Sequence, residues 1–305
     1  MAGNLTVRVG VVQSGVTPYD IDETLRRCDR LVTECARGGA AFVLLPEFFS
    51  TGNNFESRLL GYAIDTYPAV DEWLRDRSRE LGVTIAGACL VPDGGDVWNR
   101  FFIQQPDGTR VFRTKTVSPA PEAVYYRTVR NDDPLVASSH GTIGAMICAE
   151  SFSPRISGAD FTGCSMIAMV FAIPRVMGGI RPLRGRMAVF PALLSRRFGV
   201  PVLVASMGGR FSSVNPAVSP VPFRMSGLYA GRSGIYAPGA RPVGPVPPGE
   251  ETVLVADIVT GPGAARPDTS IRIPTGMPAV ITLADFFLLN RARSIYTDDM
   301  MNGRR

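Results

Sequence analysis

The stretch AFVLLPEFFSTG, residues 41–52, predicts both a type of fold and a possible site. Its first five residues are all apolar, which is typical of a short strand buried on both faces of a sheet. An acid, Glu47, follows directly after Pro46, and turn-forming residues come next. Because α/β folds bind ligands beyond the carboxyl ends of their strands, we expect Glu47 to lie at a site.

Two further strand-like segments share this layout. Residues 110–113 lead through a threonine to Lys115, and residues 142–147 lead directly to Cys148. Turn-forming or polar residues follow each of them. If these strand ends meet at one edge of the fold, then Glu47, Lys115 and Cys148 share a pocket.

Strand-like and helix-like periodicities alternate along the rest of the chain. Strands are predicted at residues 5–12, 41–45, 83–90, 101–105, 110–113, 142–147, 166–171, 200–205, 234–236 and 252–258, and helices at 21–37, 70–81 and 183–198. Asp20 or Asp22 is expected to cap the first helix, and residues 238–248 to join the last two strands as a hairpin. This alternation predicts one α/β domain over residues 1–260. Residues 261–305 lose the alternation and are expected to form a tail, with an apolar cluster at 284–289 that serves packing or subunit contact.

The composition excludes several classes of protein. The chain has 305 residues, 45% of them hydrophobic, which allows a large core. Its net charge is +5, but arginines alternate with acids, as in residues 71–77, so we expect no nucleic-acid partner. No apolar run reaches about 18 residues, and we expect no membrane span. Five irregularly spaced cysteines and the absence of a signal-peptide pattern indicate the cytoplasm.

Lys115 is the only lysine, against thirty-one arginines. Arginine carries solvated charge as well as lysine does, so a retained lysine indicates a place that needs a compact ammonium group. The alternative is a single surface lysine left in an arginine-biased sequence. His140 is the only histidine and lies among turn residues, where we expect it to be structural. With one histidine, a zinc cluster or a histidine-activated nucleophile is not expected, and no metal or cofactor motif is present.

Glu47, Lys115 and Cys148 together would suffice for acyl chemistry. A cysteine attacks a carbonyl or nitrile carbon as its thiolate. A buried carboxylate with a raised pKa can accept the thiol proton, and a neighbouring ammonium can stabilise the thiolate and the oxyanion that follows.

Several motifs in order give the chain a family resemblance. PEFFSTG at 46–52, Lys115 and ICAE at 147–150 resemble the three signature segments of the nitrilase (carbon–nitrogen hydrolase) superfamily. Residues 199–205, 231–239 and 251–257 match further segments, so that the resemblance covers about residues 5–260. It implies a four-layer α-β-β-α sandwich and a homodimer.

The resemblance also implies roles for individual residues. Glu47 would be the general base, Lys115 the oxyanion stabiliser and Cys148 the nucleophile that forms a thioester. Glu122, seven residues after the lysine, would hold substrate or water. The chain departs from the family pattern at Lys-Thr-Val-Ser, 115–118, where Lys-x-His-Leu is frequent, and at Ala149, where an aromatic residue is frequent. Both departures bear on the substrate.

The substrate would be a small molecule, and further residues near the strand ends are candidates to bind it. These candidates are Ala149, Glu150, Arg155, Phe171 and Arg175. Glu150 has an equally good structural interpretation, as a cap of the following turn or a partner of the backbone. Arg155 and Arg175 would suit a substrate carboxylate, although only their positions after strand ends single them out.

Four functions are compatible with these residues. The first is an amidase that cleaves a non-peptide amide or carbamoyl group and releases ammonia or an amine. The second is a nitrilase, and the third is an acyltransferase in which an amine replaces water as acceptor. The fourth, a binding protein without activity, is disfavoured because the glutamate, the lysine and the cysteine are all present.

Overall fold

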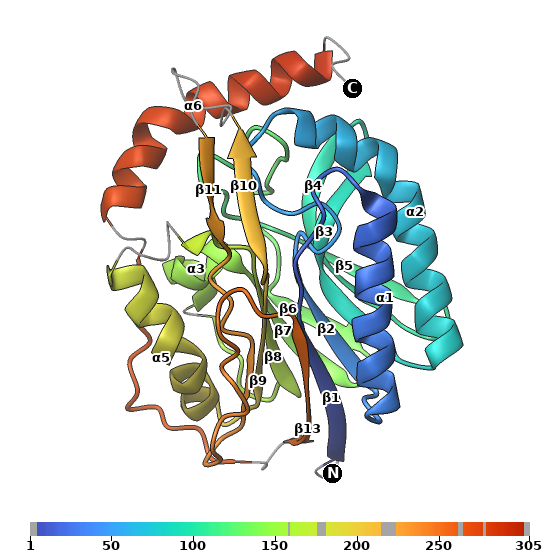
Figure 1. Ribbon diagram of the computed structural model, residues 1–305. Coiled ribbons are helices and arrows are strands. Elements are labelled where there is room, and N and C mark those ends of the chain that lie inside the picture. Colours follow the sequence, from blue (N-terminus) through green and yellow to red (C-terminus); the bar gives the residue numbers. More distant parts are fainter. Residues whose placement is uncertain are drawn as a thin grey trace.

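Two β-sheets pack face to face, and helices cover their outer faces (Figure 1), as predicted for a four-layer α-β-β-α sandwich. The computed structural model describes residues 5–157, 159–175, 181–214, 224–261, 265–276 and 279–301. Within this part of the chain, no helix is long and apolar enough to cross a membrane.

The first sheet has six strands in the order β13-β1-β2-β3-β4-β5. Their bounds are β1 Leu5–Gln13, β2 Phe42–Glu47, β3 Thr84–Asp93, β4 Asp96–Gln104, β5 Arg110–Thr114 and β13 Thr252–Thr260. Strand β2 is parallel to β1 and to β3, and all six of its residues are buried. Helices α1 (Ile21–Arg37) and α2 (Arg58–Leu81) cover the outer face of this sheet.

The second sheet has five strands in the order β12-β9-β8-β7-β6. Their bounds are β6 Leu135–Ser138, β7 Gly141–Ile147, β8 Met166–Phe171, β9 Val202–Ser206 and β12 Gly234–Tyr236. Strand β8 is parallel to both β7 and β9, and helix α5 (Arg181–Phe198) covers the outer face. The 3-10 helix η1 (Cys148–Phe152) and the short helix α3 (Pro154–Ser157) follow β7.

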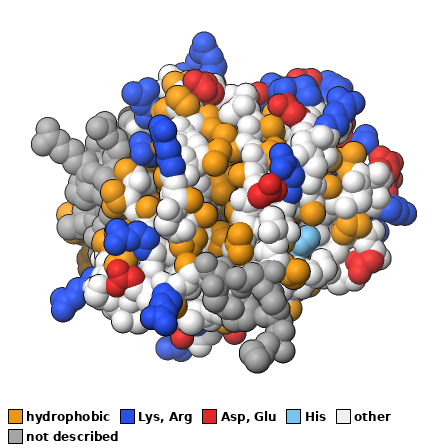
Figure 2. All heavy atoms as spheres, turned by 90° about the horizontal axis from the view of Figure 1, so that it is seen from below, with side chains coloured by type: hydrophobic (Ala, Val, Ile, Leu, Met, Phe, Trp, Pro, Cys, Tyr) orange, Lys and Arg blue, Asp and Glu red, His pale blue; other side chains and the backbone are white. Residues whose placement is uncertain are grey.

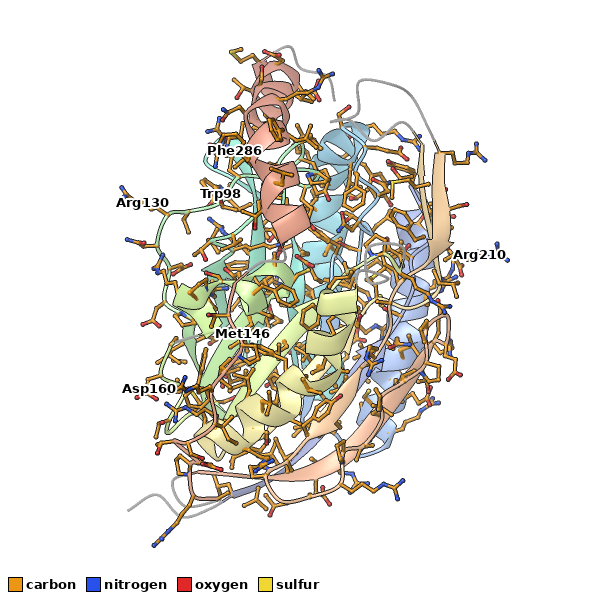
Figure 3. All side chains as sticks on the ribbon, turned by 90° about the vertical axis from the view of Figure 1, so that its left-hand side faces the viewer. Trp98, Arg130, Met146, Asp160, Arg210 and Phe286 are labelled. Atoms are coloured by element: carbon orange, nitrogen blue, oxygen red, sulfur yellow. The ribbon has the colours of Figure 1, made fainter. Side chains whose placement is uncertain are left out.

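The main core lies between the two sheets. Its side chains come from both, including Leu44 of β2, Ile103 of β4 and Ala168 of β8, none of which is exposed. Met146 of β7 is buried on the other face of the second sheet, which α5 covers, whereas Arg130, Asp160 and Arg210 project away from the body (Figure 3). A second core lies between the first sheet and helices α1 and α2. Figure 2 shows the end of the sandwich away from α6, where acidic and basic side chains are interspersed around hydrophobic ones.

The structure corrects the prediction of a hairpin at residues 238–248. Strand β12 pairs with β9 in the second sheet, whereas β13 pairs with β1 in the first. The connecting segment therefore crosses from one sheet to the other. Both strands are apolar and the segment is rich in proline and glycine, so the local pattern is the same for a hairpin and for a crossover.

The predicted helix at residues 70–81 is too short. Helix α2 begins at Arg58, and its first half contains Gly61 and Pro68, two residues that weaken a helical pattern. Leu59 and Leu60 in this half are buried against Phe48, so tertiary packing stabilises it.

The pattern also missed the short strand β6, the two-stranded sheet of β10 (Arg210–Val214) and β11 (Arg224–Leu228), and helix α6 (Ala279–Met301), which lies across the top of the sandwich in Figure 1.

Candidate active site

Glu47 is the last residue of β2, and the strand is irregular there. The pairing of β2 with β3 shifts between Leu44 and Glu47, which is the signature of a β-bulge. Phe48, the next residue, has a φ of 53°, in the left-handed region. Bulges and left-handed residues redirect side chains, and here they accompany a glutamate that is completely buried.

Lys115 lies between two carboxylates. Its Nζ donates to Oε1 of Glu47 at 2.8 Å and to Oε2 of Glu122 at 2.9 Å. All three side chains are almost wholly buried. Burial disfavours the ammonium form, but the charges of Glu122 and Glu47 outweigh this effect and hold the pKa of Lys115 well above its ordinary value. The cluster therefore contains a fixed positive charge.

One oxygen of Glu47 is held and the other is not. Oε1 accepts hydrogen bonds from Lys115 and, at 2.8 Å, from Nδ2 of Asn99. Oε2 is buried and has no hydrogen-bond partner among the residues that the structure describes. Burial raises the pKa of Glu47 to about 7 although Lys115 opposes the shift, and the charge of Glu122 adds to it. A carboxylate with this pKa and a free oxygen can accept a proton near neutral pH.

Glu122, by contrast, has both oxygens engaged. Oε2 accepts from Lys115 and, at 2.5 Å, from the hydroxyl of Tyr126. Oε1 accepts from Nδ2 of Asn53 at 3.1 Å, and the same amide nitrogen donates to the carbonyl of Ala172 at 3.1 Å. These contacts fix Glu122 as the second negative neighbour of the lysine.

Cys148 occupies the bend between β7 and η1, and its φ is 48°. A left-handed conformation is unusual for a residue with a side chain, and it points to a functional constraint at this position. The cysteine is 5% exposed. Burial and the charge of Glu47 raise the pKa of its thiol well above the ordinary value, while Lys115 and a backbone hydrogen bond from Ala172 act in the opposite direction. The charges of Glu47, Lys115 and Glu122 thus all act on this sulfur.

Glu150 ties the lysine segment to the cysteine segment. Its side chain is completely buried, and it pairs through both oxygens with the guanidinium of Arg113. Oε1 also accepts from the backbone of Thr116 at 2.7 Å, and Oε2 accepts from the backbone of Ile147 at 2.9 Å. Since Thr116 follows Lys115 and Ile147 precedes Cys148, these hydrogen bonds of Glu150 fix the backbone next to Lys115 and next to Cys148. Its oxygens are occupied, which favours its structural interpretation over direct contact with substrate.

The other predicted substrate-binding residues are spread over different environments. Ala149 is buried in η1, and Phe171 is buried at the end of β8, where it lines a small cavity with Ser151 and Phe152. Arg155 is exposed and donates to the carbonyl of Arg130 at 2.6 Å. Arg175 is also exposed. Contacts therefore join Glu47, Lys115 and Glu122, and the charges of these three groups act on Cys148, whereas no described contact links the two arginines to them.

Three residues that hold this cluster were not predicted from the sequence. They are Asn53, Asn99 and Tyr126. Asn99 could have been found, because β4 alternates buried and partly buried residues and the asparagine shares its inward face with Val97 and Phe101. A polar residue in such a position needs a buried partner. Asn53 and Tyr126 lie in loops, where no periodicity marks them.

The side chains that could bind a metal ion are those of His, Cys, Asp and Glu. Across the described ranges, no group of three or more His, Cys, Asp or Glu side chains is arranged to hold a metal ion. His140 contacts Thr84 at 3.0 Å and Phe42 in the strand region, and burial lowers its pKa.

Comparisons of the sequence with known proteins identify its family. Residues 8–169 match the family model described as carbon–nitrogen hydrolase. A nitrilase of Pyrococcus abyssi is 31% identical over 180 residues, which are 56% of this chain and 69% of that protein. An aliphatic nitrilase of Sinorhizobium fredii is 25% identical over 173 residues, 50% of this chain and 56% of its own.

The fold is similar to that of an amidase. A mutant of the amidase from Nesterenkonia sp. AN1, with acrylamide added to its active-site cysteine, superposes with a TM-score of 0.65. The match covers 82% of this chain and 92% of the amidase at 15% sequence identity. At this identity the similarity concerns the fold.

Proposed function

The chain belongs to the carbon–nitrogen hydrolase family, and from this premise we propose that it hydrolyses a small amide or carbamoyl compound through a thioester on Cys148. The observation that carries this proposal is the asymmetry of Glu47, whose Oε1 is held by Lys115 and Asn99 while its buried Oε2 remains free. A free oxygen on a carboxylate of raised pKa is what a general base requires.

In the first half of the reaction, Glu47 accepts the proton of the Cys148 thiol, and the sulfur attacks the carbonyl carbon of the substrate. The carbonyl π electrons move to oxygen. Lys115 stabilises the oxyanion, because its ammonium has three N–H groups and only two of them are engaged by Glu47 and Glu122. When the tetrahedral intermediate collapses, the protonated Glu47 gives its proton to the leaving nitrogen, the C–N bond breaks, and ammonia or an amine departs.

In the second half, water attacks the thioester carbon. Glu47 takes a proton from the water, a second oxyanion forms beside Lys115, and the C–S bond breaks as the sulfur regains a proton. The acid is released and Glu47 returns to its starting charge. Glu122 stays bound to Tyr126 and Asn53, so in this proposal it sets the position and charge of Lys115 rather than carrying protons.

Intact-mass spectrometry tests the proposal. The protein is incubated with a panel of small amides, carbamoyl compounds and nitriles, and the wild type is compared with Cys148→Ala. We expect an acyl adduct or a product that requires Cys148, and the added mass identifies the acyl group. Turnover that survives Cys148→Ala would overturn the mechanism.

Nitrile hydrolysis is the second candidate, because the two sequence relatives named above are nitrilases. The same cysteine would attack a nitrile carbon to give a thioimidate, and water would then release ammonia and the acid. A nitrile that yields acid and ammonia, with no free amide accumulating and no turnover of the matching amide, would favour this candidate.

We also propose a homodimer in a reducing compartment, the cytoplasm. Helix α6 presents three large apolar side chains at its surface, namely Leu283, Phe286 and Phe287, which are 59%, 78% and 69% exposed. An apolar face of this kind supports contact with a second copy of the chain. All five cysteines are free and buried, which suits a compartment where disulfides do not form.

A further inference from the structure

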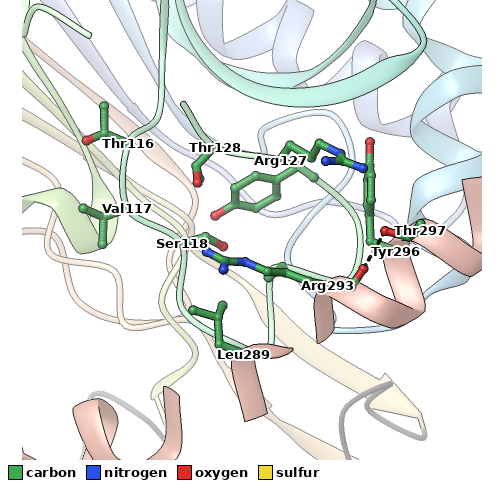
Figure 4. A pocket seen from close by; sticks show the side chains of 11 residues that line it. Thr116, Val117, Ser118, Arg127, Thr128, Leu289, Arg293, Tyr296 and Thr297 are labelled. Carbon is green, nitrogen blue, oxygen red and sulfur yellow. Dashed lines mark hydrogen bonds between the residues drawn. The ribbon is translucent and has the colours of Figure 1, made fainter. Parts of the chain in front are cut away.

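A groove of about 510 Å³ lies between helix α6 and the segment that carries Lys115 and Glu122 (Figure 4). One wall is formed by residues 116–118, 123 and 126–128, and the other by Leu289, Arg293, Tyr296 and Thr297 of α6. Thr116 directly follows Lys115, and Ala123 directly follows Glu122. The groove therefore borders the catalytic cluster.

Tyr126 connects the groove to the cluster. Its ring lines the groove, and its hydroxyl donates to Oε2 of Glu122 at 2.5 Å. The centre of the same ring lies 5.2 Å from Nζ of Lys115. A molecule in the groove thus lies one side chain away from the groups that act on the substrate.

The lining of the groove is positively charged. It contains two arginines and no acid. Arg127 is neutralised by Asp96, at 2.7 Å, and lies over the ring of Tyr296. Arg293 is exposed, and no acidic side chain in the described ranges pairs with it. In Figure 4 its side chain reaches from α6 across the groove toward Ser118.

The wall that carries Arg293 is fixed to the catalytic segment. Asp285 of α6 accepts a hydrogen bond from the backbone of Ala120 at 2.7 Å, and the hydroxyl of Tyr296 accepts one from the backbone of Val97 at 2.9 Å. Arg293 lies between these two anchors in the sequence, so the helix holds its backbone at a defined place relative to Glu122, with its guanidinium within reach of the groove. A guanidinium with free N–H groups is a strong partner for a carboxylate.

We infer that this groove binds a carboxylate group of the substrate and that Arg293 determines specificity for amides that carry one. The inference rests on the proposed function and gives it a substrate class, namely small amides with a carboxylate away from the scissile bond. Arg293 takes the place of Arg155 and Arg175, which the sequence had offered for this role. It contacts no reacting atom and acts only on which substrate is held.

The test compares charged and neutral amides of equal length. The values of kcat/KM for succinamate and butyramide, and for glutaramate and valeramide, are measured in the wild type, Arg293→Gln, Arg293→Lys and Arg291→Gln. Arg291 is also exposed on α6 but does not line the groove, so its variant removes the same charge from the same helix. We expect the charged-to-neutral ratio to fall about 10-fold to 100-fold in Arg293→Gln. It should recover in part in Arg293→Lys and stay unchanged in Arg291→Gln.

A second readout does not depend on turnover. Binding of succinamate to Cys148→Ala is measured by calorimetry, with and without Arg293→Gln. Loss of binding with Arg293→Gln supports the inference even if no amide is hydrolysed, in which case the proposed function fails alone. Cys148-dependent turnover whose charged-to-neutral ratio is the same in the wild type and Arg293→Gln overturns the inference and leaves the proposed function standing.

Discussion

At the scale of single residues, the two glutamates that contact Lys115 differ in how fully their oxygens are hydrogen-bonded. Glu122 has both oxygens engaged by Lys115, Tyr126 and Asn53, whereas Glu47 keeps Oε2 free. The buried cluster holds two acids and one ammonium, so one excess negative charge is poorly solvated there. This excess raises the proton affinity of the acid that has fewer donors, which is Glu47.

The pH dependence of kcat/KM follows from this difference. Glu47 acts only as the carboxylate and its pKa is raised to about 7, so activity should fall as the pH drops through 7, approaching about tenfold per pH unit. Lys115 keeps its proton because its pKa is raised, so it should cause no loss up to about pH 10. Initial rates at low substrate concentration between pH 5 and pH 10 measure the profile. A rate that stays constant down to pH 5 would argue against Glu47 as the base.

Removing the charge of Glu150 should cost stability as well as rate. Glu150→Gln leaves the buried guanidinium of Arg113 without its counter-ion, which lowers the free energy of unfolding by about 3–5 kcal/mol. Because the hydrogen bonds of Glu150 position Lys115 and Cys148, kcat should fall more than KM rises. Chemical denaturation and steady-state kinetics measure the two effects.

The control is the double variant Arg113→Met, Glu150→Gln. It removes both charges and keeps an acceptor for the backbone donors of Thr116 and Ile147, so part of the stability should return while the loss of kcat remains. A double variant with the full wild-type kcat would show that the pair serves stability alone.

At the scale of helices and strands, the elements best predicted from the sequence are those buried on both faces or on one continuous face. Strand β2 is buried on both faces and reads as an unbroken apolar run, and α1 shows one apolar face and a capping residue. Helix α6 was missed because its apolar residues face several directions: Phe286 and Phe287 are exposed, whereas Ala292 and Tyr296 are buried. Its position depends on contacts with Ala120 and Val97, far away in the chain, which no local pattern contains.

The same distinction applies to the site. The strand ends marked Glu47 and Cys148, and the lone lysine marked Lys115. The pattern of β4 shows that Asn99 is buried but does not show that its partner is Glu47, and nothing local marks Asn53 as the partner of Glu122, because both hydrogen bonds join residues far apart in the chain. Propensity and periodicity report on neighbours in sequence, while these contacts arise from how the two sheets and their loops meet.

The start of α1 gives a test at this scale. The Asp20 side chain accepts a hydrogen bond from the backbone of Glu23 at 2.9 Å, so of the two predicted caps it is Asp20 that caps the helix. Asp20→Ala should lower the free energy of unfolding by about 1 kcal/mol. Asp20→Asn keeps an acceptor and should stay within a few tenths of the wild type. Equal losses in both variants would mean that the charge, and not the cap, matters.

At the scale of the whole molecule, the apolar surface of α6 sits on the outside of an otherwise mixed surface. If this face joins two copies, the chain should sediment as a dimer at micromolar concentration. Phe286→Asp together with Phe287→Asp should shift it to the monomer, because charges would be buried at the interface. The matched control is Val189→Asp on α5, which is 50% exposed and lies outside α6. A wild type that sediments as a monomer would overturn the proposed dimer.

The burial of Lys115 has a practical consequence. It provides the only side-chain amine of the chain, and that amine is fully inaccessible and held as an ammonium by two acids. Acylating reagents that label surface amines should therefore react with the native protein at its α-amino group alone. A second label can be added only when the catalytic cluster opens and exposes Lys115. The rate at which the second mass increment appears therefore measures how often the active site opens.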